Sequence, residues 1–433
     1  METFTSRNEK LEQPEQYVDV TEENFSSIME QAFHRMRHKE KAAARNERYV
    51  QKWLSWLGVR EEYTEEDIAY EEAQADNAEM IRRTSQEYVE NWQEKYVQTI
   101  KQILEKRDGS PEETKHIRPM IIFAGGAMEG AQLAGQMRAL EAMGLAKDGI
   151  FSVIVGFSAG SGPAALFATS NKKQIHNAGN IFRNVCSSKD FLDVQVSAIP
   201  PKVKVHLDTG VVASAMSKGG EYELDQEAVR RSSAEVLVTA KNYETGNVDI
   251  LDLKTKGENM IDKLVASANV PFGNRTPKVI NGEGYYDSAT GEFPIEDLIE
   301  KYKPTCVLVL PNMPFNFEML TQKQGISSAV ERATSKLASM RFFSNVEMLM
   351  KMNKMTKFMY DKFGKEEKIP IGVAFTPRAI LGPIDNNIND VDAAIMETEA
   401  ALLKEFRAVE KNMEKTIYTK PGETANFSEE TRL

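Results

Sequence analysis

Ser158 stands at the centre of Gly156-Phe157-Ser158-Ala159-Gly160, which has the pattern G-x-S-x-G. An apolar run precedes this pentapeptide, and a segment of small residues with helical character follows it. In that setting the serine is presented on a sharp turn between a strand and a helix, and the glycines Gly156 and Gly160 let the two backbones approach closely. The N-terminus of the helix adds positive potential where an oxyanion would form. We therefore predict that Ser158 is a nucleophile in acyl transfer.

The base that activates Ser158 is predicted to be a carboxylate, because no histidine stands where a Ser-His-Asp hydrolase needs one. In α/β-hydrolases the histidine comes last in the chain order. Here 227 residues follow the last of the five histidines, which are His34, His38, His116, His176 and His206. Asp287 comes directly after a strand-like segment, at the strand edge where open α/β sheets place their sites. An ionised carboxylate can accept a hydroxyl proton.

Glycines also follow the first predicted strand, in the sequence Gly125-Gly126-Ala127-Met128-Glu129-Gly130. Backbone N–H groups of such a loop, at the start of a helix, can stabilise an oxyanion. A nucleotide phosphate site is the alternative, but the spacing matches neither G-x-G-x-x-G nor the P-loop. We predict an oxyanion hole formed by Gly125, Gly126 and Ala127.

Together these motifs resemble patatin-like phospholipases over residues 117–310: a glycine-rich loop, G-x-S-x-G, and a lone aspartate, in that order. Three further segments are similar to elements of that family, namely Ala240 to Gly246, Ser267 to Phe272 and Gly284 to Asp287. The resemblance implies a lipid acyl hydrolase with a Ser158–Asp287 dyad, the loop as oxyanion hole, and neither metal nor cofactor. It also implies membrane phospholipid as substrate and, as for bacterial effectors of this family, a protein or phosphoinositide activator.

The sequence departs from the family pattern at three positions. Ala127 replaces a glycine, which a backbone donor tolerates if its φ is negative. Glu129 replaces the usual basic residue and removes a charge that could face a phosphate. Ser288 replaces a glycine after the aspartate and would disfavour a turn with positive φ. The change at Glu129 leaves the headgroup preference open.

Alternating apolar runs and helical segments predict an α/β fold. With the resemblance, we expect a three-layer α/β/α patatin-like core with a mainly parallel central sheet over residues 116–380. A helical extension is predicted before it, over residues 1–115, with the first 20 or so residues disordered. Its aromatic stripes suit packing on the core or binding of a partner protein. A C-terminal helix and a polar tail are predicted over residues 381–433.

A methionine-rich, lysine-containing helical insertion is predicted at about residues 315–364, within the α/β domain. Adaptable thioether side chains suit a cap packed on the core. A basic amphipathic helix can equally lie in a membrane interface. The sequence leaves both interpretations open.

The charge and cysteine content limit the partners and the compartment. The net charge is −11, so we expect no nucleic-acid partner. Residues 1–115 carry 26 acidic against 17 basic residues, so most of the acidic excess belongs to the N-terminal segment. Two cysteines cannot form a disulfide framework, and Cys306 in its apolar run is predicted to be a buried thiol. No apolar run is long enough to span a bilayer, and no secretory signal peptide is evident. We expect a cytoplasmic protein with peripheral membrane association, or one secreted into a host cell without a cleaved signal.

Two other functions remain open at this stage. In the first, the chain keeps the fold without catalysis and acts as a binding or regulatory module through its helical extension. Alternatively, the dyad acts on neutral lipids or soluble esters, as the loss of the basic residue at Glu129 would allow.

Overall fold

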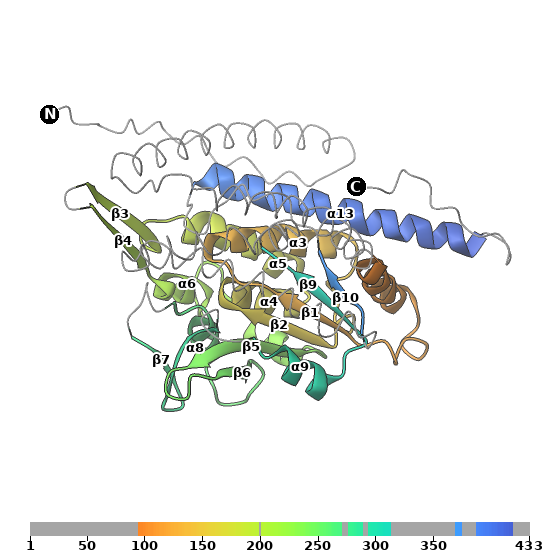
Figure 1. Cartoon of the computed structure of the whole chain (residues 1–433), viewed down its shortest axis with the longest axis horizontal. Coiled ribbons are helices and arrows are strands. Elements are labelled where there is room, and N and C mark those ends of the chain that lie inside the picture. The colour runs from red at the N-terminus through yellow and green to blue at the C-terminus, as the bar shows by residue number, and fades with distance from the viewer. Residues whose placement is uncertain are drawn as a thin grey trace, which may run out of the picture.

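The computed structural model describes residues 94–198, 201–270, 276–288, 293–312, 369–374 and 387–418 (Figure 1). The first two predicted helices, the methionine-rich insertion and the polar tail lie outside these residues. The third predicted helix of the extension is present as a helix over residues 94–108. Among the described helices, none combines the length and the apolar character that crossing a bilayer would require.

The described chain is a mixed α/β structure built on a mostly parallel sheet. Its strands are β1 (Pro119–Phe123), β2 (Val153–Phe157), β5 (Glu235–Asn242), β6 (Val248–Asp252), β7 (Lys278–Ile280), β8 (Glu283–Asp287), β9 (Cys306–Leu310) and β10 (Ile371–Val373). The order across the sheet is β10-β9-β1-β2-β5-β8-β7, and β6 also pairs with β5. The first five strands of this order are parallel, whereas β6, β7 and β8 join through antiparallel pairs.

The central strands are apolar because both faces of the sheet are buried. Odd-numbered residues of β1, such as Ile121, belong to a core formed with helices α3 (Ala131–Ala142), α4 (Ser161–Ala168) and α5 (Lys172–Asn180). Even-numbered residues, such as Ile122, face a second core that includes α9 (Ile295–Tyr302). The predicted α/β class with a mainly parallel sheet is therefore confirmed.

The remaining elements connect these layers. A π-helical turn (Ile181–Cys186) follows α5 and leads into a separate two-stranded antiparallel hairpin of β3 (Leu192–Ala198) and β4 (Pro201–Leu207). The hairpin projects from the body of the molecule (Figure 1). Helices α6 (Thr209–Met216), α7 (Gln226–Arg231) and α8 (Met260–Ser267) complete the described helices between β4 and β7. Cys306 is a buried free thiol, as predicted.

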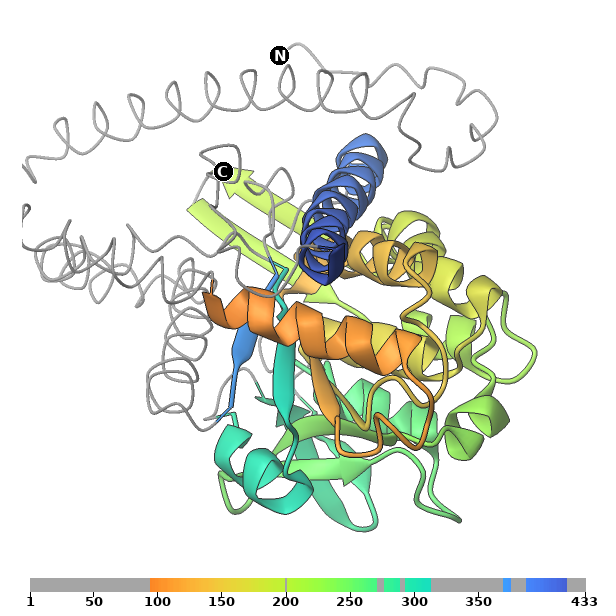
Figure 2. The same cartoon turned by 90° about the vertical axis from the view of Figure 1, so that its right-hand side faces the viewer.

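The long helix α13 (Ile388–Tyr418) packs against α3 and beside the helix over residues 94–108 (Figure 2). The α3 contact is close because Gly135 has no side chain: a Cβ there would lie 2.0 Å from the carbonyl oxygen of Ile395. A buried ion pair joins Arg138 of α3 to Glu399 of α13 at 3.1 Å. Helix α3 thus links the sheet core to the C-terminal part of the chain.

Candidate active site

Ser158 lies directly after β2, on the turn between β2 and α4, and is buried. Its φ is +52°, in the left-handed region that non-glycine residues seldom adopt. Such a conformation costs about 1–3 kcal/mol and persists only where the surrounding structure holds it. Strain at a serine between a strand and a helix is the expected geometry of a nucleophile presented on a sharp turn.

Two other serines hold the backbone of Ser158 in this conformation. The N–H group of Ser158 donates to Ser267 Oγ at 3.0 Å, and its carbonyl oxygen accepts from Ser161 Oγ at 2.7 Å. Ser161 begins α4, and Ser267 ends α8, so elements far apart in the sequence fix the same residue. Because both serines are buried, water cannot replace these bonds at low cost.

The glycines of the pentapeptide are required by close packing. A Cβ at Gly160 would lie 2.3 Å from the carbonyl oxygen of Phe123, and a Cβ at Gly156 would lie 2.7 Å from the backbone of the helix that follows. Gly130 is restricted in the same way, with 2.7 Å to the ring of Phe182. Any side chain at these three positions would therefore separate β1, β2 and α4 or displace the aromatic ring.

Asp287 is the last residue of β8 and is completely buried. Ser158 Oγ donates a hydrogen bond of 2.5 Å to Asp287 Oδ2. The backbone N–H of Asp287 donates to the carbonyl oxygen of Asn269, whose side-chain amide donates in turn to the carbonyl oxygens of Thr276 and Tyr285. The structure thus brings together two residues that are 129 positions apart and holds the carboxylate from the loop after α8.

The loop Gly125–Ala127 follows β1 and lies against the serine. A Cβ on Gly125 would be 2.3 Å from Ser158 Cβ. Among the described residues, no acceptor pairs with the backbone N–H groups of Gly125, Gly126 and Ala127. These donors are therefore available to a ligand beside Ser158.

Ala127 does not meet the condition of a negative φ under which an alanine replaces glycine without strain. Its φ is +51°, so the alanine adopts the left-handed conformation for which glycine is usual. The loop keeps its path and carries local strain instead. Ser288, by contrast, has no positive φ, and its hydroxyl lies 2.8 Å from that of Thr239.

Glu129 lies in the short 3-10 helix Ala127–Gly130 and is only 4% exposed. Burial raises the pKa of its carboxyl group to about 8, because the ionised form loses its hydration. At pH 7 the side chain is therefore mostly protonated. It offers neither the positive charge usual at this position in the resembling family nor a negative one.

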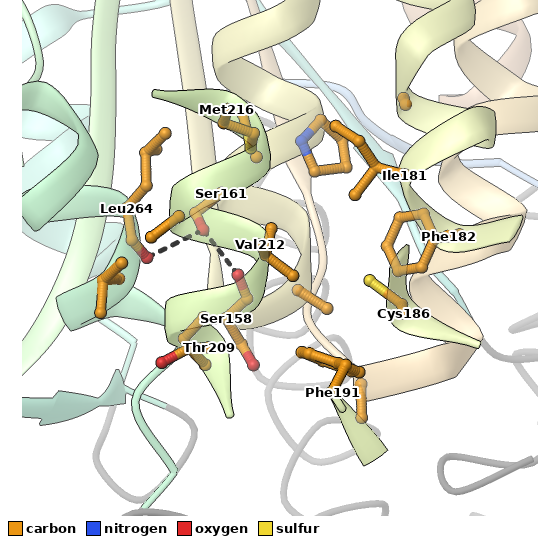
Figure 3. A pocket seen from close by; sticks show the side chains of 18 of the residues that line it. Ser158, Ser161, Ile181, Phe182, Cys186, Phe191, Thr209, Val212, Met216 and Leu264 are labelled. Atoms are coloured by element: carbon orange, nitrogen blue, oxygen red, sulfur yellow. Dashed lines mark hydrogen bonds between the residues drawn. The ribbon is translucent and has the colours of Figure 1, made fainter. Parts of the chain in front are cut away.

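An apolar cavity of about 110 Å³ lies beside Ser158 (Figure 3). Helices α4, α6 and α8 and the π-helical turn supply most of its wall. The side chains named in Figure 3 include Ile181, Phe182, Cys186, Val212, Met216 and Leu264. Ser158, Ser161 and Thr209 are the hydroxyl side chains among the lining residues. Such a wall is complementary to hydrocarbon and offers almost no partner for a polar group.

Some features of this site were not found by sequence reasoning. Ser161, three residues after Ser158, was not among the predicted site residues. A hydroxyl at the start of a helix is nevertheless well placed to form a hydrogen bond with nearby backbone groups. The π-helical turn that lines the cavity has no clear sequence signal, although such turns are frequent at functional sites. His116 is exposed and His176 is half-buried, and neither lines the cavity.

Comparison with known proteins gives limited information. No protein-family model matches the sequence, and no curated protein matches it. Among solved structures, the chain is similar to the crystal structure of VipD from Legionella pneumophila, with 11% sequence identity and a TM-score of 0.37 over 67% of each chain. The function must therefore be argued from the site itself.

Proposed function

We propose that this protein is a serine lipid acyl hydrolase that cleaves fatty-acyl esters of phospholipids or lysophospholipids at a membrane surface. The observation that carries the proposal is the 2.5 Å hydrogen bond from Ser158 Oγ to Asp287 Oδ2 beside an apolar cavity. The resemblance of the motifs to patatin-like phospholipases supports the same activity and, with it, a three-layer patatin-like core.

In the proposed reaction, Ser158 Oγ attacks the carbonyl carbon of the ester while Asp287 takes the hydroxyl proton. The ester C–O bond then breaks, and the leaving alcohol receives that proton. A water molecule, deprotonated by Asp287, then attacks the resulting acyl-serine. The bond between the acyl carbon and Ser158 Oγ breaks, Asp287 returns the proton to Oγ, and the fatty acid is released. The acyl chain occupies the apolar cavity during both steps, which places the carbonyl group at the cavity's end near Ser158.

The negative charge of each tetrahedral intermediate falls on the former carbonyl oxygen. Gly125 of the loop lies against Ser158, and the N–H groups of Gly125, Gly126 and Ala127 are the proposed donors. The 3-10 helix that follows the loop and the N-terminus of α4 add positive potential at this point. A neutral Glu129 is consistent with this role, since an anion beside the loop would oppose charge on the oxygen.

The test is fatty-acid release from vesicles of phosphatidylcholine and phosphatidylinositol phosphates, with and without a eukaryotic cell extract to supply an activator. Ser158→Ala and Asp287→Asn should each abolish release. Ser233→Ala and Asp297→Asn are matched controls, because both residues are exposed and Ser233 lies at the opposite end of the strands. Release that survives both site substitutions contradicts the dyad.

Labelling with a fluorophosphonate separates this proposal from a binding module without catalysis. An activated Ser158 should react, and Ser158→Ala should not. Absence of labelling in the wild-type protein, with and without extract, would favour the binding module.

A second candidate, an esterase for neutral lipids, is favoured by one observation. Glu129 is buried and mostly uncharged, so the loop presents no cation to a phosphate. Comparing hydrolysis of phospholipid with that of monoacylglycerol of the same acyl chain distinguishes the two substrates.

A further inference from the structure

Asn312 is a buried polar residue that has no role in the reaction proposed above. It lies two residues after β9 and has no exposed surface. Among the residues that the structure describes, neither its Nδ2 nor its Oδ1 has a hydrogen-bond partner. A buried carboxamide that pairs neither its donors nor its acceptor is unfavourable, and such groups in folded proteins call for an explanation.

The position of Asn312 relates it to the proposed oxyanion loop. Strand β9 pairs with β1 on the side away from β2, so Asn312 and Ser158 flank the loop from opposite sides. Gly125 contacts Ser158, whereas a Cβ on Gly126 would lie 2.0 Å from Asn312 Nδ2. The two glycines are thus enclosed between the nucleophile and the carboxamide.

The two residues directly before Asn312 are held by hydrogen bonds. The N–H of Ala124 donates to the carbonyl oxygen of Leu310 at 3.1 Å, which joins the ends of β1 and β9. Gln136 Nε2 of α3 donates to the carbonyl oxygen of Pro311 at 2.9 Å. The carboxamide is therefore held against the loop, although it forms no bond there.

The acceptor that we consider in the loop is the carbonyl oxygen of Gly125. In a planar trans peptide the N–H and C=O groups point in opposite directions. If the N–H of Gly126 points toward an oxyanion beside Ser158, the carbonyl oxygen of Gly125 points to the opposite side, where Asn312 lies. The next carbonyl oxygen, that of Gly126, already accepts from the N–H of Glu129 at 3.1 Å.

We infer that Asn312 is a positioning residue for the oxyanion hole: when the oxyanion forms, its Nδ2 donates to the carbonyl oxygen of Gly125 and holds the Gly125–Gly126 peptide with its N–H toward the oxyanion. This inference rests on the proposed hydrolase function. A positioning role explains why an amide occupies this buried place, where an apolar side chain would leave no unpaired polar atoms.

Asn312→Leu is the decisive substitution, because it separates a positioning role from a structural one. Leucine removes the donor without leaving a large cavity, and it also removes the unpaired polar atoms. If Asn312 acts only as packing, the variant should unfold at the same or a higher temperature and keep its activity. Asn312→Ala is a second variant in case leucine does not fit, and Asn247→Ala, in an exposed turn, is the control.

The activity measured is hydrolysis of p-nitrophenyl butyrate, together with inhibition by an alkyl trifluoromethyl ketone. Ser158 Oγ adds to the ketone carbon, its proton passes to Asp287, and the carbonyl oxygen becomes an oxyanion, so the inhibitor reports on the hole directly. We expect Asn312→Leu to lower kcat and to weaken inhibition by about tenfold or more, toward the 10²–10³-fold loss typical of a missing oxyanion donor. KM should stay within about twofold, because the cavity that binds the acyl chain is unchanged.

Three results are distinguishable. Unchanged kcat and inhibition in a folded Asn312→Leu variant would overturn the positioning role while leaving the hydrolase proposal intact. Equal weakening of KM and inhibition with unchanged kcat would likewise overturn it, since that pattern indicates altered substrate binding. Wild-type protein that hydrolyses neither p-nitrophenyl butyrate nor the phospholipid vesicles, with and without the cell extract, would overturn the proposed function and this inference with it, and so would hydrolysis that survives Ser158→Ala.

Discussion

Glu129 makes the stability of this protein depend on pH in a predictable direction. The carboxyl group has a pKa of about 8 in the folded protein, against 4.5 for an ordinary glutamate. Between these values the folded state keeps a proton that the unfolded state has lost. The contribution of Glu129 to the free energy of unfolding is therefore greatest below pH 4.5. It falls as the pH rises and is lost by about pH 8.

The size of the effect follows from the same shift. One proton bound in the folded state alone changes the free energy of unfolding by about 1.4 kcal/mol per pH unit. Glu129→Gln keeps the shape of the side chain but has no proton to lose. The variant should therefore differ least from the wild type at pH 5 and become progressively more stable than it toward pH 8, by a few kcal/mol.

Urea unfolding of both proteins at pH 5, 6, 7 and 8 measures this difference. Glu300→Gln, an exposed position on α9, is the control and should show no such trend. A difference between wild type and Glu129→Gln that stays constant from pH 5 to pH 8 would refute the argument, because it would mean that Glu129 ionises at an ordinary pH in the folded protein.

Two further predictions concern the nucleophile and the cavity. Ser267→Ala leaves the buried N–H of Ser158 without an acceptor. The substitution should therefore lower the free energy of unfolding by about 1–3 kcal/mol and reduce kcat more than it changes KM. A variant that is as stable as the wild type in urea and as active in ester hydrolysis would contradict this prediction. Val212→Trp fills part of the cavity, so it should reduce kcat/KM for long-chain esters but not for acetate esters. At about 0.8 kcal/mol for each methylene group that the tryptophan excludes from the cavity, kcat/KM should fall by roughly fourfold per methylene. An equal loss of kcat/KM for both kinds of ester would show that the acyl chain binds elsewhere.

Local patterns predicted the parts of the fold that have strong periodicity. The run around Ile121 was predicted as a buried parallel strand and the run around Val307 as a strand, since continuous apolar residues between breakers are typical of them. The hairpin of β3 and β4 was missed, because the sequence between its strands, Ile199-Pro200, has none of the glycine or asparagine signals of a tight hairpin. Helix α5 was also missed, although Asn171 caps its N-terminus.

The candidate site was only partly accessible from the sequence. Ser158, Asp287 and the glycine-rich loop were selected from motifs, and the structure places them together, but their catalytic roles stay predictions until they are tested. Asn312 could not be selected, because a single polar residue after a strand is common and its position beside Gly126 depends on the strand order. The positive φ of Ala127 could not be predicted, since side-chain identity alone does not determine backbone conformation at a strained loop.

The contact between α3 and α13 has a consequence for the order in which this protein can fold. Thr398 Oγ1 donates to the carbonyl oxygen of Gln132, across 266 positions of sequence. During synthesis, every residue of the candidate site is made before α13. Until α13 is made, the apolar side of α3 is uncovered. The site would therefore reach its final support only near the end of synthesis, and chains released before residue 388 would be both incomplete and prone to aggregate.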